Sequence, residues 1–279
     1  MNENNHMNAA ELARKAAQVR MDAIEMIYKS GDGHPAPSMS AADIVTALYF
    51  GVMNVRPEEP DWNERDRFIL SKGHACPALY AALGQKGYFS REEYPNLRKI
   101  NSILQGHPDM NKTPGIDMTA GSLGNGLGAG FGMAMAARLM KLPFRAYVLC
   151  GDGELGEGII WEAAQSAAKY GLDTLTLFID NNGMQSGGAV EDVGGIINIP
   201  GKFAAFGWQV IEIDGHDMQQ ILDAVGKAHA TKGIPTCVVA KTVKGKGVPF
   251  MEHNNAWHKR TPTTEEYELA MAALKEVCK

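Results

Sequence analysis

The strongest constraint on the fold is a strand–helix–strand unit in the middle of the chain. A short apolar run, Tyr147 to Cys150, predicts a buried strand that leads directly into Gly151-Asp152-Gly153. A helical segment from about Gly158 to Tyr170 follows. A second apolar run, Thr174 to Ile179, then ends in Asp180-Asn181-Asn182. Because ligands bind at the carboxyl ends of strands in an open parallel sheet, these polar residues mark a candidate site.

The residue types at these strand ends suit a metal–diphosphate site. Asp152 offers a carboxylate and Asn182 an amide oxygen, and Mg²⁺ prefers hard oxygen ligands beside phosphate and water. Gly151 and Gly153 lack a Cβ, so their backbone N–H groups can approach a phosphate near a helix N-terminus. A plain glycine turn before a capped helix would explain Gly-Asp-Gly alone, but the Asn-Asn pair at the next strand end favours the metal–diphosphate site.

The rest of the chain repeats the alternation of strand and helix. Strands are predicted at Arg67 to Leu70 and at about residues 147, 175, 209 and 236, with helices between them. This order predicts right-handed crossovers and an α/β fold, a mostly parallel sheet with helices on both faces. We expect a single domain over residues 1–279. Its first helix would span 9–30, its core sheet about 68–240 and its last helix 264–277.

Two segments rich in glycine and proline are harder to assign. Gly31 to Pro35 is a cluster of helix breakers, which predicts a loop over Ala36 to Met39. Ser40 would then be the N-cap of a helix from Ala41 to Phe50. The glycine-dense stretch Thr119 to Gly132 predicts a tight loop and then a close-packed helix to about Leu142.

Composition excludes several classes of protein. The net charge of −5 gives no basic surface for nucleic acid. No apolar run is long enough to cross a bilayer, and the N-terminus has no apolar core of a signal peptide. The four cysteines have no zinc or disulfide spacing and fit reduced thiols of a cytoplasmic protein.

Four histidines lie beside glycines, prolines or aromatic residues in expected loops: His34, His74, His107 and His258. A lone loop histidine is usually exposed and idle. Four of them, in a sheet protein with a candidate diphosphate site, favour a shared role, because histidine can donate hydrogen bonds to phosphate and hydroxyl groups and transfer protons near neutral pH.

Taken together, these motifs resemble the N-terminal, thiamine-diphosphate-binding part of transketolases. Gly-Asp-Gly followed about 30 residues later by Asn-Asn is similar to the fingerprint of thiamine-diphosphate enzymes in general. The more specific matches are Gly33-His34-Pro35, Leu70-Ser71-Lys72-Gly73-His74, Gly106-His107-Pro108, Gly121-Ser122-Leu123-Gly124, Asp214-Gly215-His216-Asp217, Lys244-Gly245-Lys246-Gly247 and Trp257-His258. They occur in the family's order, over about residues 10 to 262.

The resemblance implies a role for individual residues. Mg²⁺ would be held by Asp152, the Asn182 side chain and the Met184 carbonyl. The remaining roles fall into three groups. Gly153, His74, Lys244 and His258 would contact the diphosphate or the nearby end of the substrate; Gly121, Ser122 and Leu123 would line the pocket for the cofactor's rings; His34, His107 and His258 would face the ketose oxygens. Glu157 and Glu162 match acidic positions near a subunit contact, although acidic residues at a helix start also serve as dipole partners.

The resemblance also implies a partner. Full-length transketolases continue into a pyrimidine-binding domain, whose glutamate activates the cofactor, and then into a third domain. A chain of 279 residues resembles the separate N-terminal subunit of a split transketolase. We therefore expect it to be inactive alone and to form an α₂β₂ assembly with a C-terminal subunit, transferring a two-carbon ketol unit between sugar phosphates.

Two other functions remain open from the sequence. The chain could be the α-subunit of a 2-oxo-acid dehydrogenase, or a sugar-phosphate synthase of the same fold. It could also be a non-catalytic subunit that binds the cofactor and only scaffolds a complex. The loop histidines and Gly121-Ser122-Leu123-Gly124 favour transketolase over these.

Overall fold

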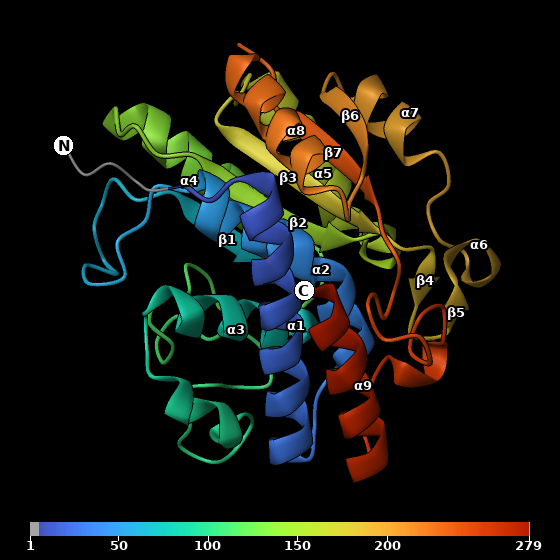
Figure 1. Cartoon of the computed structure of the whole chain (residues 1–279). Coiled ribbons are helices and arrows are strands. Elements are labelled where there is room, and N and C mark those ends of the chain that lie inside the picture. Colours follow the sequence, from blue (N-terminus) through green and yellow to red (C-terminus); the bar gives the residue numbers. More distant parts are fainter. Residues whose placement is uncertain (1–5, 279) are drawn as a thin grey trace.

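The core of the molecule is one parallel β-sheet. In the computed structural model, which describes residues 6–278, five strands are ordered β1-β2-β3-β7-β6 (Figure 1). The strands are β1 (Arg67–Leu70), β2 (Ala146–Gly151), β3 (Leu175–Asn181), β7 (Thr236–Lys241) and β6 (Gln209–Asp214). All neighbouring pairs are parallel, which confirms the expected sheet. Gly151 is paired with Asp180, and Asn181 with Lys241, so polar residues align at the carboxyl edge.

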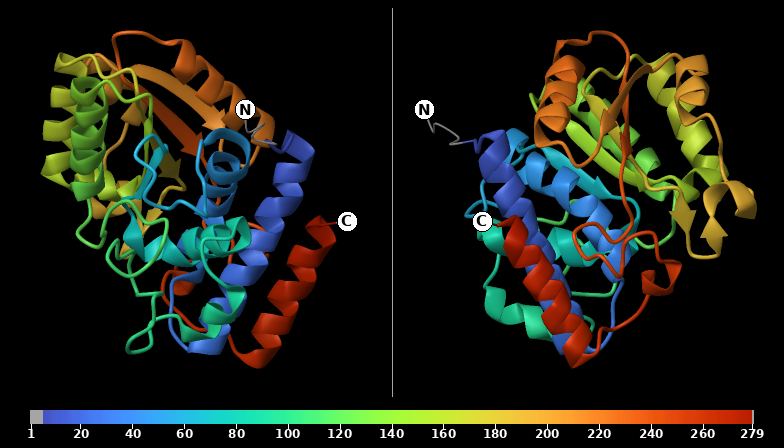
Figure 2. Two further views of the ribbon diagram at one scale, coloured as in Figure 1. Left: turned by 90° about the vertical axis from the view of Figure 1, so that its left-hand side faces the viewer. Right: turned by 45° about the vertical axis from the view of Figure 1, so that its right-hand side comes forward.

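Helices cover both faces of the sheet (Figure 2). One face carries α1 (Ala9–Ser30), α2 (Pro35–Ala47), α3 (Cys76–Lys86) and α8 (Met218–Ala230). Their apolar side chains form a cluster with strand residues such as Tyr147, Leu149 and Phe178. The alternate strand residues, among them Val148 and Ile179, pack on the other face. Because side chains alternate along a strand, each strand contributes to two separate cores.

The second face is covered by α4 (Asn125–Met140), α5 (Gly158–Lys169) and α7 (Ile199–Ala205). The glycines of α4 allow a close approach to the sheet. A Cβ on Gly126 would lie 2.4 Å from the Ser71 side chain, and one on Gly130 would lie 2.4 Å from Val148. The prediction of a close-packed helix after the glycine-dense loop is therefore confirmed, with its end at Met140 rather than Leu142.

The C-terminal helix α9 (Thr264–Val277) lies along α1. Thr263 and Glu266 form a capping box at its start. The rings of Tyr28 and Tyr267 stack with their centroids 4.3 Å apart. The first and last helices are therefore packed together, each with the bounds expected from the sequence.

The expected start of α2 was wrong. The helix begins at Pro35, so the predicted loop over Ala36 to Met39 is its first turn. Proline is well tolerated in the first turn because the N–H it lacks has no partner there. Ser40 is not an N-cap but lies inside the helix, where its hydroxyl is 2.6 Å from Asp180 Oδ2. A π-helical turn, Leu48–Val52, follows α2.

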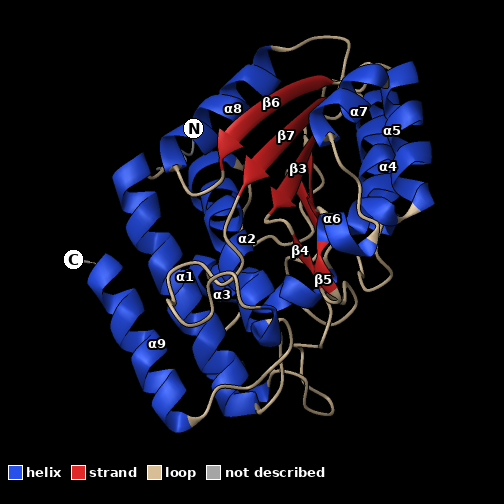
Figure 3. Cartoon of the chain, turned by 90° about the vertical axis from the view of Figure 1, so that its right-hand side faces the viewer, coloured by secondary structure: helices blue, strands red, loops and turns tan. Residues whose placement is uncertain are grey.

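The segment after β3 forms small elements that the sequence did not indicate. Strands β4 (Met184–Gln185) and β5 (Gly188–Ala189) make an antiparallel hairpin, followed by the short helix α6 (Val190–Val193). The hairpin lies on the side toward which the arrowheads of the sheet strands point (Figure 3). It therefore borders the carboxyl edge of the sheet. Within residues 6–278, no helix combines the length and the apolarity that crossing a membrane would require.

Candidate active site

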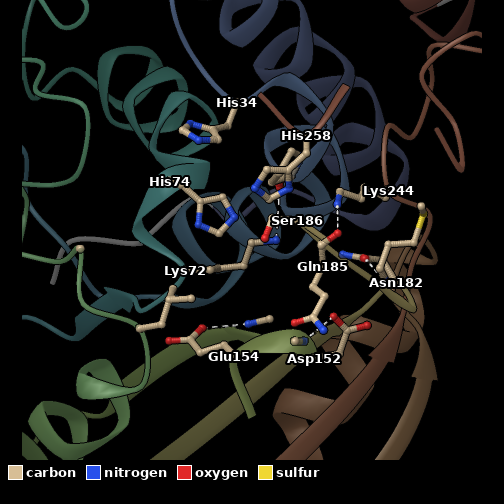
Figure 4. Close-up of a pocket in the computed structure, with 16 residues that line it drawn as sticks. His34, Lys72, His74, Asp152, Glu154, Asn182, Gln185, Ser186, Lys244 and His258 are labelled. Carbon is tan, nitrogen blue, oxygen red and sulfur yellow. Dashed lines mark hydrogen bonds between the residues drawn. The ribbon is translucent and has the colours of Figure 1, made fainter. Parts of the chain in front are cut away.

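A pocket of about 250 Å³ opens at the carboxyl ends of the central strands. Ten of the predicted residues line it: His34, His74, Gly121, Leu123, Asp152, Gly153, Asn182, Met184, Lys244 and His258 (Figure 4). The pocket thus gathers residues that lie far apart in the sequence, because the loops that carry them all leave the same edge of the sheet.

Four predicted residues do not line the pocket. His107 is exposed but lies next to it, because a Cβ on Gly121 would be 3.7 Å from His107 Cγ. Ser122 is exposed beside Gly121. Glu157 and Glu162 are exposed around the start of α5, outside the pocket. Their position fits a surface contact rather than a place in the pocket itself.

Asp152 follows β2 directly and is only 2% exposed. Its Oδ1 accepts a hydrogen bond from the Gly153 N–H at 2.7 Å, and its Oδ2 accepts one from the Gly183 N–H at 2.5 Å. Burial, and secondly the negative charge of Asp180, raises the pKa of Asp152 to about 6. The carboxylate is therefore held in place, but its negative charge is poorly compensated. A bound cation would compensate that charge.

The oxygen donors around Asp152 suit Mg²⁺. Asn182 lines the same pocket, and its Oδ1 accepts the Met184 N–H at 3.1 Å. Among residues 6–278 no group of three or more His, Cys, Asp or Glu side chains could hold a metal ion. One carboxylate with amide and carbonyl oxygens fits a hard cation that also binds phosphate.

The pocket lining includes one member of an ion pair that sequence reasoning missed, Lys72. Lys72 Nζ is paired with Asp180 Oδ2 and donates to the Pro37 carbonyl at 3.3 Å. Asp180 is fully buried and also accepts hydrogen bonds from Ser40 and Thr242. Burial alone would raise the pKa of Asp180, but Lys72 and these hydroxyl groups outweigh it and hold the pKa below its usual value. Asp180 therefore stays charged beside Asp152.

Glu154 is a second buried carboxyl group that the sequence did not single out. It accepts hydrogen bonds from the Gly124 N–H at 2.7 Å, from the Gly151 N–H at 3.0 Å and from the Ser71 hydroxyl. Burial raises its pKa. Glu154 thereby connects the loop that carries Gly121 to the end of β2. Its position one residue after Gly-Asp-Gly was the only signal that could have revealed it.

Three histidines form a cluster on one wall of the pocket. The ring centroids of His34, His74 and His258 are 5.3 to 5.6 Å apart. Burial is the main cause that lowers the pKa of His34 and of His258 to about 4, and it lowers the pKa of His74 as well. All three rings are therefore neutral at pH 7, so each can donate one hydrogen bond and accept another.

One atom of this cluster has an unmet hydrogen-bonding capacity. His258 Nδ1 is buried and has no partner among the residues that the structure describes. Buried polar atoms are normally paired, and an exception in a pocket calls for a ligand. His258, a lining residue of the pocket, thus has one ring nitrogen with an unused hydrogen-bonding capacity.

Lys244 connects the hairpin β4–β5 to the loop that follows β7. Its ammonium group donates to Asn255 Oδ1 at 2.7 Å and to the Gln185 carbonyl at 3.4 Å. Asn255 in turn donates to the Ser186 carbonyl at 2.9 Å. Burial, and then the charge of Lys72, lowers the pKa of Lys244 to about 8, so the group remains mostly protonated at pH 7. Lys244 is therefore a cation in the pocket lining that could bind a phosphate.

The family model described as "Transketolase, thiamine diphosphate binding domain" matches residues 12–274. The chain belongs to this family. The expected resemblance to a transketolase N-terminal part is thereby confirmed, and a 2-oxo-acid dehydrogenase α-subunit is not favoured. The donors of the pocket fit thiamine diphosphate: oxygen ligands for a cation, a lysine ammonium group and an unpaired imidazole nitrogen.

Two members of the transketolase family match this chain over nearly its whole length. It is 41% identical over 270 residues to a subunit of the apulose-4-phosphate transketolase of Phocaeicola vulgatus, covering 97% of this chain and 96% of that one. It is 43% identical over 266 residues to the 6-deoxy-6-sulfo-D-fructose transketolase subunit SqwG of a Clostridium species, covering 95% and 97%. Both relatives are named as subunits, and each is matched over nearly its whole length.

Full-length transketolases are matched only in part. The crystal structure of transketolase from Campylobacter jejuni superimposes with a TM-score of 0.91 and 31% identity, covering 96% of this chain but 43% of that one. This agreement confirms the thiamine-diphosphate-binding fold. The chain thus corresponds to the cofactor-binding part of a longer transketolase and, in length, to the separate subunits of the Phocaeicola and Clostridium enzymes.

Proposed function

We propose that the chain is the N-terminal subunit of a divided transketolase that moves a two-carbon ketol unit from a ketose phosphate to an aldose phosphate. The observation that carries the proposal is the pocket itself. It combines a metal-type oxygen set at Asp152 and Asn182 with three neutral histidines, in a chain as long as named transketolase subunits.

Asp152, the Asn182 side chain and the Met184 carbonyl would hold Mg²⁺. Lys244, His74 and the Gly153 N–H would bind the diphosphate that the cation bridges. The Gly153 N–H now donates to Asp152, so diphosphate binding would exchange that hydrogen bond. Gly121, Ser122 and Leu123 would line the space for the cofactor's rings. Once bound, thiamine diphosphate supplies the carbanion and the electron sink for the carbon–carbon bond cleavage.

The protein's own contribution to the reaction would come from His34, His107 and His258. Neutral imidazoles can hold the substrate hydroxyl groups in one orientation and transfer a proton as the bond to the ketol unit breaks or forms. His34 and His258 are in the pocket wall, whereas His107 lies at its exposed margin. This arrangement supports contacts with the reacting end of the sugar from the first two and with an incoming substrate from the third.

The remaining parts of the site would come from other chains. A C-terminal subunit with a pyrimidine-binding domain would supply the glutamate that activates the cofactor, in an α₂β₂ assembly in the cytoplasm. Glu157 and Glu162, exposed around the start of α5, would lie at the subunit contact. Residues 1–279 would fold as a single domain of that assembly. The relatives act on a ketose phosphate and a sulfonated ketose by name, so we propose a donor ketose with a terminal anionic group.

A reconstitution assay tests this proposal. The protein is combined with a C-terminal transketolase subunit, then supplied with thiamine diphosphate, Mg²⁺ and an aldose phosphate. Ketol transfer is expected from xylulose 5-phosphate or a sulfonated ketose, only with both subunits, and no turnover is expected with pyruvate. Turnover of pyruvate would instead indicate 2-oxo-acid chemistry. Cofactor binding without any ketol transfer would indicate a scaffold subunit.

A further inference from the structure

His216 belongs to a motif, Asp214-Gly215-His216-Asp217, that has no part in the pocket lining. It lies between β6 and α8, on the turn where β6 ends. Its side chain is only 11% exposed, although the turn itself is at the surface. A buried polar side chain on a surface turn calls for a physical explanation.

Both ring nitrogens of His216 are engaged. Nδ1 lies 2.6 Å from Asp43 Oδ2, and Nε2 accepts the backbone N–H of Val243 at 2.8 Å. Since a backbone N–H can only donate, Nε2 must be unprotonated, and the proton of the neutral ring is then on Nδ1 and is donated to Asp43. The two contacts therefore specify one tautomer and one orientation of the ring.

Asp43 is itself held in place by Arg20. It lies in α2, where the Arg20 guanidinium group of α1 donates to both of its oxygens, at 3.0 Å to Oδ1. Arg20 also donates to the Met39 carbonyl at 3.1 Å. Burial alone would raise the pKa of Asp43, but Arg20 and His216 hold it below its usual value. The carboxylate is thus a charged, rigid acceptor for His216.

The Val243 N–H is one residue away from Lys244, which reaches into the pocket. Several hydrogen bonds hold the segment around Lys244. The Thr242 hydroxyl donates to Asp180, the Val243 N–H donates to His216, and the Gly245 N–H donates to the Ala36 carbonyl at 3.1 Å. The Lys244 carbonyl itself accepts the His253 N–H at 3.0 Å. Among the contacts named here, only the one to His216 comes from the turn between β6 and α8. It ties this turn to the loop that carries the lysine.

We propose that His216, oriented by Asp43 and Arg20, is a positioning residue that holds the Val243 backbone so that the Lys244 ammonium group faces an anionic ligand in the pocket. The inference rests on the proposed function, because that function makes the ligand a diphosphate. His216 touches neither the pocket nor the ligand and acts only through Lys244.

Two substitutions separate the two contacts of His216. In H216Q the side-chain carbonyl can reach the place of Nε2 and accept the Val243 N–H. In H216N the shorter amide can donate to Asp43 in the place of Nδ1 but cannot reach Val243. If His216 positions the loop, Gln should rescue and Asn should not. A merely structural role, as a partner for the buried Asp43, predicts the reverse.

Amide hydrogen exchange of the ligand-free subunit measures directly how often the hydrogen bond of the Val243 amide opens. In H216N the Val243 amide should exchange about fivefold faster than in wild type, because the loss of one hydrogen bond lowers the opening free energy by roughly 1 kcal/mol. H216Q should exchange it like wild type. The β3 amides report whether each variant is folded. His229→Asn is the matched control, because His229 is bonded to Tyr147 instead, at 2.7 Å near the other end of the sheet.

A second measurement tests whether Lys244 is correctly positioned. It is the affinity for thiamine diphosphate with Mg²⁺, measured calorimetrically on the subunit with its partner. H216N should raise the dissociation constant at least about fivefold, and H216N added to K244A should weaken binding no further. Three results would each overturn the inference while leaving the proposed function intact. They are losses of affinity that multiply when H216N and K244A are combined, wild-type affinity in H216N, or unchanged exchange of the Val243 amide in H216N. No binding by the wild-type protein would overturn the proposed function and, with it, the role of Lys244.

Discussion

Lys72 and Asp180 form an ion pair that is almost completely removed from solvent, with side-chain exposures of 3% and 0%. It connects the segment after β1, where Lys72 lines the pocket, to the carboxyl end of β3. Charges this deeply buried persist only when they are paired and hydrogen-bonded. The pair thus holds together the strand ends on which the site is built.

Lys72→Met should therefore be strongly destabilising. It leaves the Asp180 carboxylate buried without its cation, and the loss of one member of such a pair lowers the free energy of unfolding by about 3–5 kcal/mol. Urea unfolding followed by circular dichroism measures the change. Adding Asp180→Asn to Lys72→Met should restore much of the lost stability, since it removes the unpaired charge. A Lys72→Met protein as stable as wild type would show that the pair has no structural importance.

Asp152→Ala should abolish Mg²⁺-dependent binding of thiamine diphosphate, because it removes the one carboxylate of the expected metal site. Calorimetric titration with and without Mg²⁺ provides the measurement. Asp173→Ala is a suitable control. Asp173 accepts the Gly233 N–H at 2.9 Å, away from the carboxyl edge of the sheet, and its loss should leave the affinity for the cofactor unchanged. Unchanged affinity in Asp152→Ala would refute the site assignment.

His107→Ala should lower the turnover number of the reconstituted enzyme by about 10²-fold, the usual effect of losing a proton-transfer or hydroxyl-orienting group. The affinity for thiamine diphosphate should stay close to that of wild type, because His107 lies outside the pocket lining. His253→Ala changes an exposed loop histidine that does not line this pocket; it is the control and should retain full turnover. Equal losses in both variants would argue against a specific role for His107.

The stability of the ligand-free subunit should depend on pH through His258. Its pKa is about 4 in the folded protein, against about 6.5 in an unfolded chain, so the unfolded state binds more protons between these values. The stabilisation linked to the neutral ring is complete above pH 6.5 and is lost as the pH falls toward 4. Wild type should therefore lose stability relative to His258→Gln over this window, measured by urea unfolding at each pH. A constant difference would mean that the ring titrates normally.

The central part of the fold could be predicted because its signals are local. The apolar runs of β2 and β3, the glycines between them and the polar residues at their ends are all visible in one short stretch of the printed sequence. Parallel pairing then places Asp152 and Asn182 at one edge, as the structure has them.

The parts that were missed depend on contacts between distant residues. Nothing near Lys72 in the sequence indicates Asp180, which is 108 positions away. Gly31 to Pro35 was read as a cluster of helix breakers followed by a loop, although the burial of Pro35 and of the residues after it supports a helix that starts at Pro35. The hairpin β4–β5 is too short to have a periodicity, so only the structure reveals that Gln185 and Ser186 contact the loop after β7.

The five strands run in one direction, and this has a practical consequence for modifying the protein. The exposed turn Lys232-Gly233-Ile234 precedes β7 and lies at the opposite edge from the pocket. An affinity tag or fluorescent label inserted there would change the length of the connection without altering the loops that carry Asp152, Lys244 or the histidines. The loops at one end of the sheet thus carry the candidate site, and the turn at the other end is a place for a tag or label.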